Sequence, residues 1–196
     1  MLQPTNDQFI KIALADDIVV LSIRGHIAID SALSDVILQA LPNPHLLEVE
    51  RLSFLLKFDL AVALKSMNKN SRPLFQKLNA IRNQFAHQAA AEFNDTTAQE
   101  LKNCMTELHK KIVKHTFETA KKSRDILEIA TAAAFYEANY AHESLVNRKL
   151  ERDAVREETE ILLKETEQYS NHPATGEFGK RVKSRLEAKQ KSLREK

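Results

Sequence analysis

The sequence predicts an all-α protein, because few residues interrupt helices and apolar residues recur at helical spacing. Three glycines and five prolines occur in 196 residues, while 29% of the residues are charged and 43% are hydrophobic. Such a chain is long enough to bury a substantial core but has few turn-forming residues for a β fold. Apolar residues step by three and four positions over several segments, as one face of a helix requires. We expect an up-and-down helical bundle followed by a long charged helix.

Two helices are expected before residue 42. Pro4 to Asp7 supply capping side chains for a short first helix. The second helix runs from about Asp16 to Leu41 and ends at Pro42-Asn43-Pro44. Its apolar face comprises Ile29, Ala32, Leu33, Val36, Ile37, Ala40 and Leu41. Charged residues interrupt the segment, so we interpret it as a core helix with no role in a membrane.

Two further helices complete the first half of the chain. The third extends from roughly His45 to Met67. The fourth begins at Ser71 or Arg72, where Pro73 is tolerated because the first turn needs no donor from it. This fourth helix has an apolar face formed by Leu74, Leu78, Ile81 and Phe85. The opposite, polar arc carries Asn79, Arg82, Asn83 and His87.

The second half is predicted to hold longer helices. One is expected from about Thr97 to Phe117, and another from Ser123 to roughly Gln168, where no glycine or proline occurs. Beyond Asn147 the apolar stripe is sparse, which predicts pairing with another helix, for which a second subunit is one candidate. Gly179 to Lys196 forms either a last short helix or a disordered tail. We divide the chain into a bundle over 1–120, an extended helix for dimer or partner contact over 121–170, and a basic tail over 171–196.

Charge and composition exclude several classes of function. The net charge is +2, but residues 177–196 carry eight Lys/Arg against three Glu, so this tail is +5 and the rest is −3. The tail, including Lys180 and Arg181, can therefore contact phosphates. The single cysteine, Cys104, excludes an internal disulfide and fits a reducing cytoplasm. No residues at metal-ligand spacing and no glycine-rich phosphate loop occur, so we expect neither a metal nor a cofactor.

Arg82 and His87 on the polar arc are suited to phosphodiester chemistry. Arginine holds phosphate charge in a planar fork, and histidine moves protons near neutral pH. Five positions separate them, which is about 140° around an ideal helix. They cannot both point at one atom from a single rigid helix, whereas two such helices meeting across a two-fold axis could share one cleft.

This pattern resembles the R-x4-H signature of HEPN domains. Two further segments and the one that holds the motif follow in an order similar to that of the mannitol operon repressor family and related HEPN-like proteins. They are Arg24-Gly25-His26, then Arg51-Leu52-Ser53-Phe54 leading into Lys57-Phe58-Asp59-Leu60-Ala61, and last Leu78 to His87. The resemblance covers about residues 16–117. It implies a bundle of four or five helices that dimerises through the motif helices.

The resemblance leaves two classes of function open. The first is a metal-independent endoribonuclease, of the kind found in toxins and phage-defence effectors, with an RNA substrate and a cognate antitoxin. Arg82, Asn83 and His87 would then be catalytic, and Asn79, Lys180 and Arg181 would bind RNA. The second is a non-catalytic regulator, such as a repressor-like transcriptional regulator or an interaction scaffold with a regulatory partner protein.

Several other polar and aromatic residues have a simpler interpretation than catalysis. Arg24 and His26 are expected to approach the motif helix as structural polar contacts. Asp30 and Asp59 are expected to be surface or capping carboxylates. Tyr136 and Tyr140, one helical turn apart, favour interface packing over base stacking.

Overall fold

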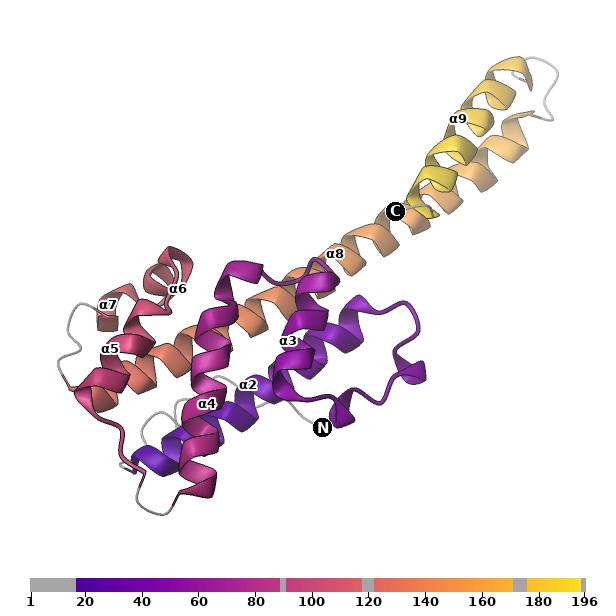
Figure 1. The fold of residues 1–196 in the computed structure, drawn as a ribbon. Coiled ribbons are helices and arrows are strands. Elements are labelled where there is room, and N and C mark those ends of the chain that lie inside the picture. The colour runs from indigo at the N-terminus through magenta and orange to yellow at the C-terminus, as the bar shows by residue number, and fades with distance from the viewer. Residues whose placement is uncertain (1–16, 89–90, 118–121, 171–175, 195–196) are drawn as a thin grey trace. The chain divides into compact units, whose positions relative to one another are not determined.

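The computed structural model describes residues 17–88, 91–117, 122–170 and 176–194, which confirm the all-α prediction. All regular elements in these ranges are helices, and no strand occurs among them (Figure 1). The first helix, expected just after Asp7, lies outside the described residues. The chain divides into two compact units, Met1–Leu145 and Val146–Lys196.

Helix α2 spans Ile18–Ala40 and forms the centre of the first unit, as predicted. The Asp17 side chain caps it by accepting hydrogen bonds from the backbone nitrogens of Val19 and Val20. Its apolar face is almost completely buried, with Leu21, Ile29, Leu33, Val36 and Ile37 at 0% exposure. Helices α3 and α4 both pack against it.

The prediction of the third helix is wrong at its beginning, and the observed helix ends earlier than predicted. Two 3-10 turns, Pro44–Leu46 and Val49–Arg51, precede α3, which spans Phe54–Ala63. The turns place Val49 in the core, where it is fully buried. Lys65 adopts a left-handed φ of 58°. The backbone nitrogens of Lys65 and Ser66 then bond to the carbonyls of Val62 and Ala61, which ends the helix before Met67.

Helix α4 spans Arg72–His87 and begins where the sequence predicts. Its apolar residues Leu74, Phe75, Leu78 and Ile81 are buried. The rings of Phe75 and Phe58 lie 4.5 Å apart between centroids, which joins α4 to α3. The opposite face of α4 therefore stays available for polar chemistry.

The helix expected from Thr97 to Phe117 is broken into three pieces. They are α5 (Asp95–Asn103), α6 (Glu107–Ile112) and α7 (Lys114–Phe117). The break arises because Thr106 starts a new helix: its hydroxyl accepts from the backbone of His109, whose ring accepts from the backbone of Thr106. This reciprocal cap uses histidine where glutamate or glutamine is usual, so the sequence pattern did not reveal it.

The predicted long helix is confirmed as α8, Ser123–Ser170. Its first part belongs to the first unit and buries a run of mostly small residues: Leu127, Ala130, Ala133, Ala134, Phe135 and Ala138. In the second unit, α9 (Gly176–Arg194) runs back beside the end of α8 (Figure 1). The basic end is thus helical over its described residues, which selects one of the two alternatives left open by the sequence.

Gly25 on α2 lies close against α8, because a β-carbon there would lie 2.4 Å from Cγ2 of Thr131. We expect Gly25→Ala to lower the free energy of unfolding by about 1–3 kcal/mol through this overlap. Helix propensity alone predicts the opposite, a gain of about 1 kcal/mol. Urea unfolding of the purified variant measures the change.

The matched control is Gly25→Ala combined with Thr131→Ser, which removes Cγ2 but keeps the hydroxyl that donates to the Leu127 carbonyl. This double variant should recover at least half of the lost stability. A double variant as unstable as Gly25→Ala alone contradicts the packing explanation.

Candidate functional site on the polar face of α4

The polar residues of α4 lie on one face, but they are not equally exposed. Asn79, Arg82 and Asn83 are half-buried, whereas His87 is exposed at the last residue of the helix. No hydrogen bond joins Arg82 to His87 in the described parts of the chain, in line with their separation of about 140° around the helix. A single α4 therefore presents the arginine and the histidine at two different places.

Arg82 carries a positive charge that none of the described residues neutralises. Its Nη1 donates to Oδ1 of Asn83 at 3.0 Å. Its Nε is buried and has no hydrogen-bond partner. Among the residues that the structure describes, no carboxylate lies within salt-bridge distance of the guanidinium. Such an arginine retains donors for an anionic group, and its fork suits a phosphate.

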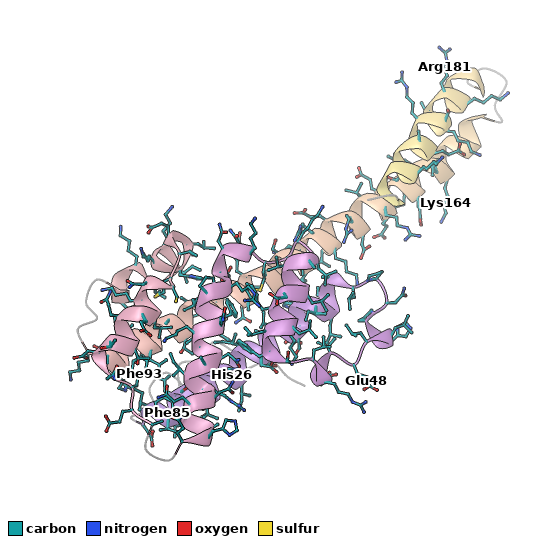
Figure 2. All side chains as sticks on the ribbon, in the orientation of Figure 1. His26, Glu48, Phe85, Phe93, Lys164 and Arg181 are labelled. Atoms are coloured by element: carbon teal, nitrogen blue, oxygen red, sulfur yellow. The ribbon has the colours of Figure 1, made fainter. Side chains whose placement is uncertain are left out.

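His26 on α2 lies against this face (Figure 2). Its Nε2 lies 3.0 Å from Oδ1 of Asn79, and its ring stacks on Phe54 with centroids 4.1 Å apart. The amide oxygen can only accept, so Nε2 carries the proton. Burial lowers the pKa of His26 below 6.5, the Asn79 bond opposes this shift, and the charge of Arg82 adds to the lowering. His26 is therefore neutral at neutral pH.

A buried ion pair lies next to His26. Lys57 on α3 is 2% exposed, and its Nζ donates to Oδ2 of Asp30 at 2.6 Å. Asp30 follows His26 by one turn of α2. The charge of Asp30 raises the pKa of His26, whereas the charge of Lys57 lowers it. Asp30, expected as a surface or capping carboxylate, has a side chain that is 34% exposed, but the sequence did not reveal that it compensates a buried lysine. Lys57 occupies an apolar position of α3 with Phe54, Phe58 and Ala61, and that register is the signal that could have revealed it.

The structure brings together only some of the predicted site residues. His26 makes the expected polar contact, whereas Arg24 is exposed. Asp59, expected as a surface or capping carboxylate, pairs with Arg72 at the start of α4. Lys180 and Arg181 are exposed on α9, in the second unit. Figure 2 labels Arg181.

Other features of the described chain bear on chemistry. No group of three or more His, Cys, Asp or Glu side chains is arranged to hold a metal in the described ranges. Burial raises the pKa of the Cys104 thiol, which disfavours the reactive thiolate. No helix among the described residues is both long and apolar enough to span a bilayer.

Comparison with known proteins finds no matching family model, no matching curated protein and no matching solved structure.

The lowered pKa of His26 predicts a specific loss of stability in acid. The unfolded state binds a proton near pH 6.5, whereas the folded state resists it, so protonation favours unfolding below that pH. Wild-type protein should lose stability between about pH 7.5 and about pH 5.5 more steeply than His26→Gln. Urea unfolding at several pH values measures both slopes.

His45→Gln is the control, because it removes an exposed histidine and leaves the His26 site intact. Equal slopes for wild type and His26→Gln would show that His26 titrates normally in the folded protein.

Proposed function

We propose that the protein is a metal-independent endoribonuclease of the HEPN type. The main support is Arg82, a half-buried arginine that is not neutralised by a carboxylate among the described residues. Asn83 accepts from it, and the exposed His87 follows on the same helix. A fixed cation and an accessible imidazole are the groups that phosphodiester cleavage needs when no metal takes part.

The reaction follows from these roles. The 2′-hydroxyl of the ribose attacks the adjacent phosphorus, and the bond to the 5′-oxygen of the next nucleotide breaks. His87 acts as the general base or acid for this proton transfer, a role worth about 10²–10⁴-fold in rate. Arg82 stabilises the charge that grows on the phosphoryl oxygens, and Asn83 orients the phosphate or the imidazole. The products are a 2′,3′-cyclic phosphate and a 5′-hydroxyl.

The same proposal includes a homodimer, because Arg82 and His87 do not meet on one helix. Two α4 helices meeting across a two-fold axis would place Arg82 of one chain near His87 of the other. Apolar side chains along α8 also remain available for a partner, with Leu150 and Ile161 more than half exposed. Asn79, Lys180 and Arg181 would bind the RNA, and we place the enzyme in the cytoplasm under the control of an antitoxin or a regulatory protein.

A non-catalytic regulator is the second candidate, and the His26–Asn79 contact favours it. That hydrogen bond and the neighbouring Lys57–Asp30 pair make part of the polar face a structural element. In this case Arg82 would bind a phosphate or a carboxylate of a nucleic acid or partner protein without breaking a bond.

Removal of either motif side chain should abolish cleavage without unfolding the protein. Arg82→Ala and His87→Ala should each lose most RNA cleavage, while their free energies of unfolding change by less than about 1 kcal/mol. EDTA should leave the wild type fully active. Gel assays on single-stranded RNA and transfer RNA measure cleavage, and urea unfolding measures stability.

Gln84→Ala is the matched control, since Gln84 is exposed on the same helix between the two residues. It should retain wild-type cleavage. Full activity of both motif variants would eliminate this mechanism, and an inactive wild type would favour the non-catalytic regulator.

A shared cleft predicts complementation between two inactive chains. A heterodimer of one Arg82→Ala chain and one His87→Ala chain retains one intact pair, with Arg82 from one chain and His87 from the other. Chains carrying two different tags and purified by both should recover measurable cleavage. Light scattering should give twice the 22.3 kDa mass of one chain.

Doubly tagged Arg82→Ala dimers, which hold no Arg82, should remain inactive under the same conditions. A heterodimer as inactive as this control, or a monomeric mass for the wild type, is incompatible with a site shared between chains.

A further inference from the structure

A cavity lies in the first unit, on α6 and α8, and shares no residue with the polar face of α4. Its cavity has a volume of about 670 Å³, which is within the range of small-molecule sites. Two apolar pairs form its walls, each one turn apart on its helix: Leu108 and Ile112 on α6, and Tyr136 and Tyr140 on α8. Leu108, Ile112 and Tyr140 are 47%, 38% and 74% exposed, so these three side chains leave apolar surface open toward the cavity.

Glu137 lines this cavity although it is only 6% exposed. Its Oε1 accepts a hydrogen bond from Oγ of Ser71 at 2.7 Å. Its Oε2 lies 2.7 Å from Nε2 of His109, which is fully buried. Each carboxylate oxygen has two acceptor sites, so each keeps one for a further donor.

The hydrogen bonds of His109 determine its charge. Its Nδ1 accepts from the backbone N–H of Thr106 at 3.0 Å. That nitrogen must therefore carry a lone pair, and the proton resides on Nε2 and is donated to Glu137. Protonating Nδ1 as well would place two N–H groups against each other and break the cap of α6. His109 is thus a neutral donor, and it cannot balance the charge of the carboxylate.

Glu137 is therefore a buried carboxyl group with no cationic side chain beside it among the described residues. In the described part of the chain, no lysine or arginine lies within salt-bridge distance of it. A second carboxylate, Glu143, lines the same cavity and is exposed. An uncompensated buried charge is unfavourable, and a cation entering the cavity would relieve it.

From this arrangement we propose that the α6–α8 cavity binds a small organic cation with an apolar body. Its ammonium or guanidinium group would lie at Glu137, and Glu143 would attract it at the rim. Its apolar part would pack between the tyrosines and the leucine and isoleucine of α6. The tyrosine rings add attraction for the charge through their negative faces. The proposal is independent of the proposed ribonuclease activity.

Calorimetric titration with phenethylammonium, and with neutral 2-phenylethanol of similar size, tests both the site and its charge preference. The cation should bind at least about tenfold more tightly than the alcohol, since only the cation pairs with the carboxylates. Equal affinity would mean that the cavity recognises apolar groups alone, as a docking groove for a partner helix would, and this overturns the proposal. Absence of cation binding up to about 10 mM overturns it as well.

Variants of exposed residues keep the test valid if Glu137→Gln disturbs folding. Tyr140→Ala removes a wall and should weaken cation binding at least about fivefold, and Glu143→Gln should weaken the cation but not the alcohol. Leu46→Ala, at an equally exposed apolar residue on another segment, should bind like wild type. Unchanged affinity in Tyr140→Ala would show that the ligand binds elsewhere. If Glu137→Gln folds, it should reduce the preference for the cation more than Glu143→Gln does.

Discussion

A single buried carboxylate, Glu137 on α8, joins the start of α4 to α6 and thereby organises the first unit. It accepts from Ser71, which precedes α4, and from His109 of α6. His109 also caps its own helix through Thr106. These groups are buried together, so losing any one of them would leave the others unsatisfied in an apolar surrounding. The position of α4, and with it the position of Arg82, depends on this network as well as on aromatic packing.

Helix α4 shows how one element serves the core and a surface site together. Its apolar face is anchored by Phe75 and Ile81, so the rotation of the helix about its own axis is set by burial. That rotation directs Arg82 toward α2, where His26 and the Lys57–Asp30 pair lie. Arg82 thus lies near a neutral imidazole, and the ion pair that also acts on this imidazole is neutral overall. Neither compensates the charge of the guanidinium, and an anion-binding site requires that charge.

The first unit carries a basic and an acidic side chain that each lack an oppositely charged partner in the described chain. Among the described residues, Arg82 on α4 has no carboxylate within salt-bridge distance, and Glu137 has no lysine or arginine. The arginine is half-buried on a polar face and suits a phosphate, whereas the glutamate lies at an apolar cavity and suits an organic cation. Both arrangements raise the electrostatic free energy of the folded chain in the absence of ligand, and such features mark functional surfaces more often than structural ones.

Local sequence determined the helical class, the limits of α2 and α8, and the apolar face of α4, because capping, proline and periodicity act over a few residues. It also identified Arg82 and His87 as chemically suited to phosphate. Only the tertiary structure decided that Lys57 is buried against Asp30, that His26 meets Asn79, and that Glu137 joins Ser71 to His109. These partners are 27, 53, 66 and 28 residues apart, so no periodic signal connects them. The broken segment after α5 has the same cause, since burial of His109 turns an unusual cap into the start of a new helix.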